Sequence, residues 1–298
     1  TKVKNMIHRD DVVIKFAGDS GDGMQLTGTL FSDAAAIAGK DLATFPDYPA
    51  EIRAPHNTIA GVSGFQVHIG HKKIHTTGDL CDVIVAMNPA SLRANLKWAK
   101  KGAIIIVDRD AFDEKAIEKA GYKSNPLEDG SLGIFHLIDV PIATLTKESI
   151  IELGLGAKVA DKSRNMFALG MMLYIFNIGF ESTYAFLEQK FTAKPEIIKA
   201  NKMVLQAGYT YAETLEVVES KIDVPAAELP KGRYRNITGN VATSWSFLAA
   251  AERSGRPLFL GSYPITPATE ILMDLAKHKY LGARVFQAED EIAGICST

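Results

Sequence analysis

The chain has 298 residues, of which 47% are hydrophobic and 23% charged, as in globular proteins that bury a sizeable core. Its 33 lysines and arginines are balanced by 35 aspartates and glutamates. This balance argues against a nucleic-acid partner, because proteins that bind one concentrate basic residues on one face. No apolar run reaches the roughly 18–20 residues that a membrane span requires. We therefore expect a cytoplasmic protein without a membrane segment, and the length favours two domains.

The first half of the sequence alternates strand-like and helix-like segments. Residues 12–17 form a β-branched run directly before several glycines, which predicts a buried parallel strand followed by a helix over 24–38. Further expected strands are 83–86, 103–108 and 135–140, and further expected helices are 91–101 and 113–119. This alternation predicts an α/β fold with a doubly wound sheet.

The segments that follow set the expected domain limits. A methionine-rich helix around 165–173 is most simply core packing, and a second helix is expected over 196–213. Residues 216–240 carry prolines, glycines and mixed charges without a clear period, which indicates a linker. We therefore expect an α/β domain over 1–215 and a second domain over 241–298.

The second domain repeats the alternation on a smaller scale. Expected helices cover 242–254 and 268–277, and expected strands cover 257–261 and 283–287. About 60 residues are few for an independent α/β domain. The expectation is therefore that this second domain is incomplete.

The glycine-rich loop at 18–23 lies between the first strand and the first helix, where backbone amides can meet an anion. Gly18, Gly21 and Gly23 are spaced as G-x-x-G-x-G, which is neither the dinucleotide fingerprint nor a P-loop. Two interpretations stay open with equal weight. The loop, with Ser20, contacts an anion, or it is a tight turn that lets the helix pack on the sheet.

Three other features are less informative. The loop at 45–57 lies at a place where binding groups often occur, although Glu51 and Arg53 are equally well explained as a solvated ion pair. His68 and His71 do not have a convincing metal spacing, and we expect no metal site in this chain. Cys81 is interpreted as a small buried hydrophobic residue.

Two segments near the end carry candidate chemistry. Thr266 lies in a loop between Pro264 and Pro267, where its hydroxyl can contact a carboxylate, cap the next helix, or do both. Glu289 and Glu291 follow a strand and precede a helix rich in small residues. They are either charges that suit a helix start or a general acid/base in a partly buried site.

These motifs resemble those of 2-oxoacid:ferredoxin oxidoreductases. Residues 261–270 (GSYPITPATE) and 287–293 (QAEDEIA) resemble the domain of that family that binds the pyrimidine ring of thiamine diphosphate. Residues 18–24 (GDSGDGM), 46–57 and 163–166 (SRNM) resemble its gamma domain. A gamma domain placed before an alpha domain resembles the 2-oxoglutarate-type alpha subunit. The fold implied is a gamma-type α/β domain followed by the opening of a second, pyrimidine-binding α/β domain.

The resemblance implies a reaction and roles for particular residues. Members of the family decarboxylate a 2-oxoacid oxidatively, transfer the acyl group to coenzyme A and pass electrons through iron–sulfur clusters to ferredoxin. It implies that Glu291, or else Glu289, hydrogen-bonds the aminopyrimidine ring. Thr266 and Tyr263 are implied to contact the substrate. Two neighbours, Pro264 and Ile265, are implied to contact the cofactor.

The resemblance also implies a partner. The two cysteines cannot hold an iron–sulfur cluster, and no diphosphate–metal motif is present. A beta subunit is therefore expected to supply Mg²⁺, the contacts to the diphosphate and the cluster. Two alternatives to the 2-oxoglutarate reaction stay open: the same chemistry on pyruvate or a branched-chain 2-oxoacid, and a non-catalytic α/β binding or assembly subunit.

Overall fold

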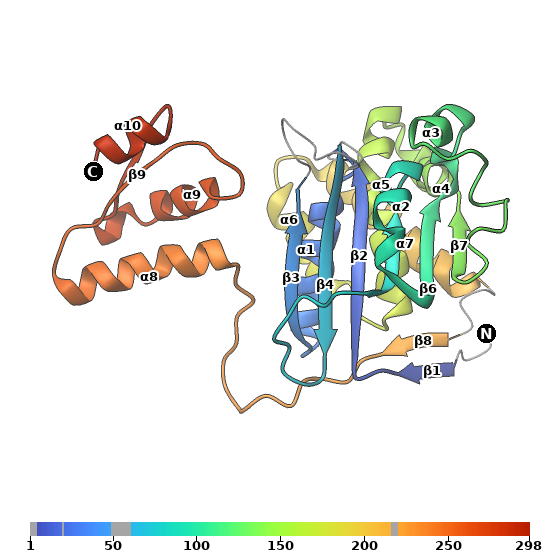
Figure 1. The fold of residues 1–298 in the computed structure, drawn as a ribbon, viewed down its shortest axis with the longest axis horizontal. Coiled ribbons are helices and arrows are strands. Elements are labelled where there is room, and N and C mark those ends of the chain that lie inside the picture. Colours follow the sequence, from blue (N-terminus) through green and yellow to red (C-terminus); the bar gives the residue numbers. More distant parts are fainter. Residues whose placement is uncertain (1–4, 20, 49–60, 216–219) are drawn as a thin grey trace. The chain divides into compact units, whose positions relative to one another are not determined.

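The computed structural model describes residues 5–19, 21–48, 61–215 and 220–298. It divides into two compact units, Thr1–Lys231 and Gly232–Thr298, which are described separately. The first unit is built on a six-stranded mixed sheet with the order β3-β4-β2-β5-β6-β7 (Figure 1). Its strands are β2 (Asp11–Asp19), β3 (Asp41–Asp47), β4 (Val62–Gly70), β5 (Cys81–Ala86), β6 (Ala99–Asp108) and β7 (His136–Val140).

Four of these strands, β2, β5, β6 and β7, run parallel, whereas β4 is antiparallel to both of its neighbours. Strand β2 is buried from Val12 to Gly18. Its nearly continuous apolar sequence, interrupted by Lys15, is therefore that of a strand covered on both faces.

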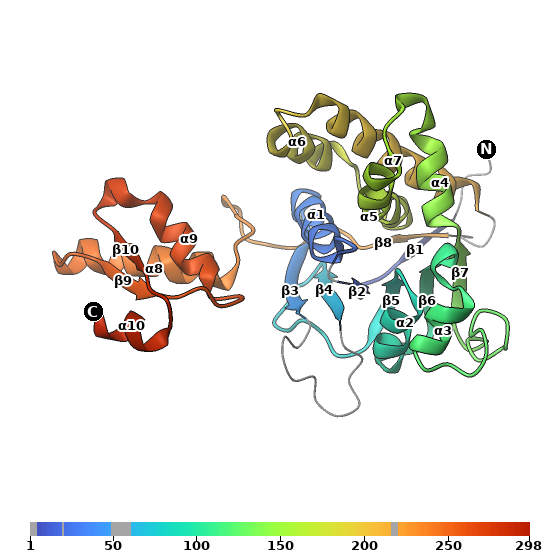
Figure 2. The same cartoon turned by 90° about the horizontal axis from the view of Figure 1, so that it is seen from above.

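Helices cover both faces of the sheet, which confirms the expected α/β fold. They are α1 (Met24–Ile37), α2 (Pro89–Asn95), α3 (Glu114–Lys119), α4 (Ile142–Ser149), α5 (Ala157–Ile175), α6 (Glu181–Lys190) and α7 (Pro195–Thr214). Figure 2 shows α2 and α3 on one face and the others on the opposite face. Two separate apolar clusters fill the two interfaces. The methionines of α5 are almost fully buried in the larger one, so core packing explains the methionine-rich stripe.

Helices α5 and α7 approach each other at two glycines. A Cβ atom added to Gly170 would lie 2.1 Å from the Leu205 carbonyl oxygen, and one added to Gly208 would lie 2.1 Å from the Phe167 carbonyl oxygen. Because both obstacles are backbone atoms, no side-chain rotation can relieve the contact. The two glycines therefore set the distance between the helices.

Replacing Gly208 with alanine is expected to destabilise the fold by about 1–3 kcal/mol, because the added methyl group overpacks this interface. Intrinsic helix propensity alone predicts the opposite sign, a gain of about 1 kcal/mol. Urea unfolding followed by circular dichroism measures the difference. Gly239→Ala is the matched control, since a Cβ there meets nothing within 4 Å. A Gly208→Ala protein as stable as the wild type would contradict the close contact.

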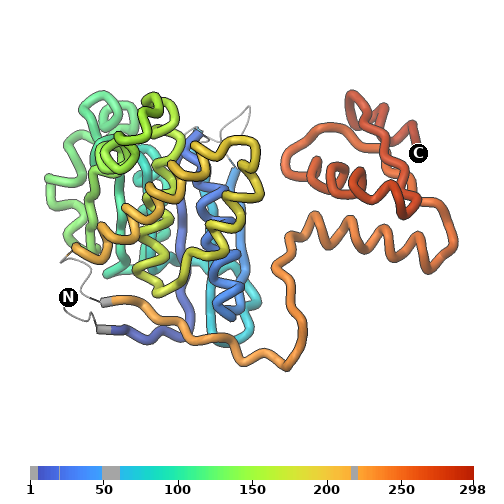
Figure 3. Tube along the Cα trace, turned by 180° about the vertical axis from the view of Figure 1, so that it is seen from behind, coloured from blue at the N-terminus to red at the C-terminus, as the bar shows by residue number. Residues whose placement is uncertain are grey.

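The expected linker over 216–240 needs a correction. Within it, Ser220–Asp223 forms strand β8, which pairs in parallel with β1 (Asn5–His8) (Figure 3). The first unit therefore extends beyond residue 215. A four-residue strand is too short to show a period of two among prolines and glycines, which explains why the sequence pattern missed it.

Two other expectations were wrong in part. The helix expected over 91–101 ends at Asn95, and β6 already begins at Ala99 after one 3₁₀ turn, η1 (Leu96–Trp98). The start of the expected loop at 45–57 belongs to β3. Among the described strands, β3 pairs only with β4, and such an edge strand tolerates Pro46, which has no N–H to donate. Residues 49–57 lie outside the described residues.

The second unit has a two-stranded parallel sheet and three helices. Its elements are α8 (Gly239–Ser254), β9 (Phe259–Ser262), α9 (Thr269–Lys277), β10 (Arg284–Gln287) and α10 (Glu291–Cys296). Much of its apolar surface is exposed, as at Met273, Leu281 and Ile295. Three further 3₁₀ turns in the chain are η2 (Arg109–Ala111), η3 (Ile151–Leu153) and η4 (Lys279–Leu281). Among the described helices of both units, none has the length and apolar character needed to cross a membrane.

Candidate functional site

In the first unit, the loops after β2, β5 and β6 meet at the carboxyl edge of the sheet. The chain leaves β2 toward β3 on one side, and it leaves β5 toward β6 on the other. This reversal makes the gap between β2 and β5 a topological switch point, where open α/β sheets bind ligands. Three polar residues mark this place: Asp22 after β2, Asn88 after β5 and Asp108 at the end of β6.

Arg164 of α5 joins two of these carboxylates. Its Nη2 lies 3.1 Å from Asp22 Oδ1, and its Nη1 lies 3.2 Å from Asp108 Oδ2. The Asp108 side chain is fully buried, and those of Asp22 and Arg164 are 12% and 20% exposed. The cluster therefore ties the loop after β2 and the end of β6 to one helix.

Burial raises the pKa of Asp22 above its usual value, although the Asp19 amide and Arg164 oppose this shift. Burial also raises the pKa of Asp108, against hydrogen bonding from the Ala143 amide and the attraction of Arg164. Two buried carboxylates thus share one guanidinium, and the arginine partly offsets the cost of their burial.

The glycine loop packs against its own side chains. The Asp19 amide donates to Asp22 Oδ2 at 2.8 Å, and a Cβ added to Gly18 would lie 2.8 Å from the same oxygen. Gly23 has a φ of 73°, and a Cβ there would lie 2.7 Å from Asn165 Nδ2. These contacts support the tight-turn interpretation.

The anion-contact interpretation of this loop stays a prediction. Gly21 has open space around it, whereas Ser20 lies outside the described residues. Sequence reasoning did not single out Asp22 or Asp108. The available signal was a single carboxylate placed directly after a buried strand, as with Asp108 after residues 103–107.

In the second unit, the two candidate segments follow neighbouring parallel strands. Ser262 pairs with Gln287 at the ends of β9 and β10, and the Ala288 amide donates to the Ser262 carbonyl at 2.7 Å. The loop at 263–267 and the acidic segment at 289–291 therefore leave the same edge of this small sheet. A Cβ on Gly261 would lie 2.6 Å from the Gly294 carbonyl oxygen, so α10 packs closely on the end of β9.

The loop after β9 does not use Thr266 as a helix cap, so that alternative was wrong. Helix α9 begins at Thr269, whose Oγ1 accepts from the Ile265 amide at 2.7 Å. Asn240 Nδ2 also donates to the Pro267 carbonyl at 3.1 Å. The residues on either side of Thr266 are thus held by hydrogen bonds, while Thr266 and Pro264 stay exposed. Within the described residues the Thr266 hydroxyl makes no hydrogen bond, so it is left for another contact.

The two glutamates flank a capping aspartate. Asp290 is the N-cap of α10, and its Oδ1 accepts from the Ala293 amide at 2.8 Å. Glu291 is the first residue of the helix, and Glu289 lies in the preceding turn; both are exposed. The structure brings both carboxylates to the edge shared with Thr266, but within residues 232–298 no water-excluding pocket surrounds them.

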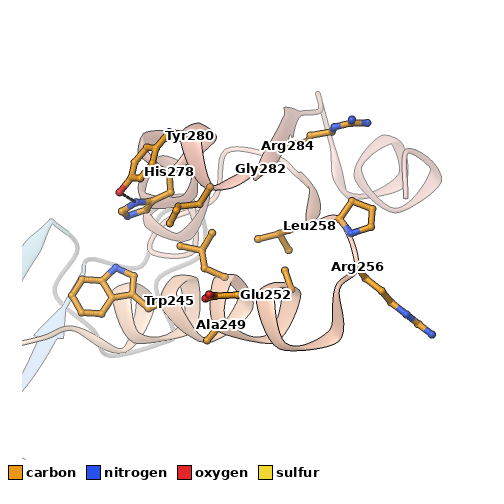
Figure 4. Close-up of a pocket in the computed structure, with 13 residues that line it drawn as sticks. Trp245, Ala249, Glu252, Arg256, Leu258, His278, Tyr280, Gly282 and Arg284 are labelled. Atoms are coloured by element: carbon orange, nitrogen blue, oxygen red, sulfur yellow. Dashed lines mark hydrogen bonds between the residues drawn. The ribbon is translucent and has the colours of Figure 1, made fainter.

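A separate cavity of about 800 Å³ lies at the other edge of this sheet (Figure 4). Its lining includes Trp245 and Glu252 of α8. It also includes Leu258, which directly precedes β9, and Arg284, the first residue of β10. Leu258 and Arg284 are at the amino ends of β9 and β10. The cavity therefore does not contain the candidate catalytic groups.

Comparison with known proteins decides the family. Residues 13–211 match the model of the pyruvate ferredoxin/flavodoxin oxidoreductase family. The chain is 48% identical over 97% of its length to 2-oxoglutarate oxidoreductase subunit KorA of Mycobacterium tuberculosis. This chain belongs to the pyruvate ferredoxin/flavodoxin oxidoreductase family.

Other members of the family extend the comparison. A 2-oxoglutarate:ferredoxin oxidoreductase from Magnetococcus marinus, solved with 2-oxoglutarate, coenzyme A and succinyl-CoA bound, is 28% identical and superimposes over 97% of this chain with a TM-score of 0.71. The alpha subunit of 2-oxoacid:ferredoxin oxidoreductase 2 from Aeropyrum pernix is 20% identical over 96% of this chain. The chain spans only 44% of KorA, 48% of the Aeropyrum subunit and 45% of the Magnetococcus chain.

Proposed function

We propose that this chain forms the gamma-type domain and the start of the pyrimidine-binding domain in the alpha subunit of a 2-oxoglutarate:ferredoxin oxidoreductase. The observation that carries the proposal is the 48% identity to KorA across nearly the whole chain. The reaction is the oxidative decarboxylation of 2-oxoglutarate to an acyl-CoA, with electrons passed to ferredoxin.

The side chains at the carboxyl edge of β9 and β10 suit the pyrimidine end of thiamine diphosphate. This edge offers two carboxylates, Glu289 and Glu291, beside a loop with an exposed threonine and with Ile265, an apolar residue that is 42% exposed. When bound, thiamine diphosphate supplies the carbon nucleophile for decarboxylation of a 2-oxoacid. Pro264 and Ile265 would line the ring, and Glu291, with Glu289 as the alternative, would hydrogen-bond it.

Thr266 and Tyr263 would position the substrate. A hydroxyl donates well to a carboxylate, and the loop that carries Thr266 is fixed by hydrogen bonds at Ile265 and Pro267. A loop held in advance loses little entropy when it binds a ligand. The exposure of both glutamates implies that additional protein surface must exclude water for acid/base chemistry, because a carboxyl group acts best in a dry site with a tuned pKa.

The remaining parts of the reaction are assigned to a beta subunit. An iron–sulfur cluster needs about four thiolates, whereas this sequence has two cysteines, of which Cys81 is buried and Cys296 exposed. The partner would therefore hold the cluster, Mg²⁺ and the diphosphate, and would deliver electrons to ferredoxin. The loop at 18–23 is kept as a candidate contact for an anion such as a coenzyme A phosphate, through Gly18, Ser20, Gly21 and Gly23.

The test is dye reduction by the complex of this subunit with its beta partner. The assay contains thiamine diphosphate, Mg²⁺, coenzyme A and a viologen, and compares 2-oxoglutarate with pyruvate and 3-methyl-2-oxobutanoate. We expect the highest kcat/KM with 2-oxoglutarate and no reduction when coenzyme A or either subunit is omitted. A preference for pyruvate or the branched-chain acid would overturn the substrate assignment. Reduction with none of the three would leave the non-catalytic alternative.

A further inference from the structure

A second cavity, of about 600 Å³, opens at the amino-terminal edge of the main sheet. It lies where β6 and β7 begin, next to the two-stranded ribbon of β1 and β8 and the last residue of α5. The ion-pair cluster around Arg164 is at the carboxyl edge of the same strands. The cavity is therefore distinct from the glycine loop, and all of its lining belongs to the first unit.

The inner wall of this cavity is aliphatic. Ile138 and Ile175 are almost fully buried, and Ile104 and Ile222 are half-buried. No aromatic side chain other than the exposed imidazole of His136 lines it among the described residues. Such a wall suits a flexible hydrocarbon body and offers little for stacking a nucleobase.

The rim of the cavity is cationic. Lys100 Nζ lies 2.8 Å from both carboxylate oxygens of Asp82, and Asp82 Oδ2 also accepts from the Val13 amide at 2.9 Å. Among the described residues of the lining, Asp82 is the single acidic side chain, and Lys100 already neutralises it. Arg9 and Lys101 are exposed at the rim, and neither side chain has an ion-pair partner in the described part of the chain.

We propose that this cavity binds a small amphipathic anion, an aliphatic carboxylate whose charged group meets Arg9 and Lys101 while its hydrocarbon body lies on the isoleucine wall. Its size is within the range of roughly 300–1,000 Å³ in which pockets bury a small organic ligand. The positive charge at the mouth selects the sign of the head group, and the isoleucine wall selects the aliphatic body. This assignment is independent of the oxidoreductase function.

The test uses the 298-residue chain and three probes with the same hydrocarbon length: decanoate, decanol and decyltrimethylammonium, each below its micelle concentration. Isothermal titration calorimetry gives affinity and stoichiometry, and ¹³C-methyl NMR of isoleucine-labelled protein gives the location. We expect one decanoate per chain, with shifts concentrated at Ile104, Ile138, Ile175 and Ile222, and weaker binding of decanol and of decyltrimethylammonium.

Charge reversal at the rim completes the test. Lys101→Glu is expected to weaken decanoate binding by about five- to tenfold, through loss of attraction and gain of repulsion near the surface. The matched control is Lys115→Glu, the same change at an exposed site on α3 that does not line the cavity, and there we expect less than about a twofold effect. Equal binding of the cationic probe, methyl shifts only at Ile265, Ile292 and Ile295 of the second unit, or equal effects of the two reversals would each overturn the proposal.

Discussion

Glu291→Gln is expected to lower the rate of 2-oxoglutarate-dependent dye reduction by the assembled enzyme by about a hundredfold or more. Glutamine keeps the size and a hydrogen-bonding oxygen but cannot exchange a proton with the pyrimidine ring, and positioned acid/base groups typically contribute roughly 10²–10⁴-fold. The measurement is kcat at saturating thiamine diphosphate and 2-oxoglutarate. It needs the complete complex, because the glutamate is exposed in the unit formed by residues 232–298.

Glu289→Gln identifies which of the two carboxylates acts. If Glu291 is the acid/base group, we expect Glu289→Gln to retain most of the activity. The reverse pattern would move the role to Glu289, and two active variants would remove it from this segment. Asp290→Asn serves as the structural control, since asparagine caps a helix about as well as aspartate and the cap of α10 depends on that side chain.

The parts of the fold that sequence predicts best are those with a strong local signal. The largely apolar, β-branched segments at 12–17 and 103–108 locate β2 and β6, because a strand buried on both faces is apolar at most of its positions. Strands β1 and β8 are different, since each has four residues and forms only by pairing with the other. The two strands lie more than two hundred residues apart along the chain, so no local sequence period reveals their pairing.

The candidate sites likewise have a part that local sequence signals predict and a part that depends on contacts between distant residues. The segments at 263–267 and 289–291 follow two strands, so their convergence at one edge follows from the parallel pairing that the alternating pattern predicts. The alternative role of Thr266 as a cap failed because the helix starts at Thr269, and that start depends on a hydrogen bond back to Ile265. Arg164 lies 142 residues from Asp22. Only the packing of α5 against the sheet brings the two together, so the ion-pair cluster was beyond local reasoning.

Arg164→Met is expected to reduce the free energy of unfolding by about 3–5 kcal/mol, because removing the shared arginine leaves the buried carboxylates of Asp22 and Asp108 without a cationic partner. Arg109→Met is the matched control. Arg109 lies 3.1 Å from Asp139, the same separation as between Arg164 and Asp22, but both side chains of this pair are about half exposed, at 52% and 43%. Solvent screening limits that loss to about 1 kcal/mol or less. Equal losses in urea unfolding would contradict a special role for the buried cluster.

The pH dependence of the stability provides a second test of the Arg164→Met prediction. Burial already raises the pKa values of Asp22 and Asp108, so the folded state holds their protons more tightly than the unfolded state does. Their contribution to stability is therefore fully present below the unfolded pKa and is lost as the pH rises through the folded values. Without Arg164 both pKa values rise further, and the deficit of Arg164→Met should be larger at about pH 8 than at about pH 5. Adding Asp108→Asn should then recover part of the loss at the higher pH, because it removes one uncompensated charge. A deficit that is the same at both pH values would show instead that Arg164 stabilises the fold by packing and not by charge.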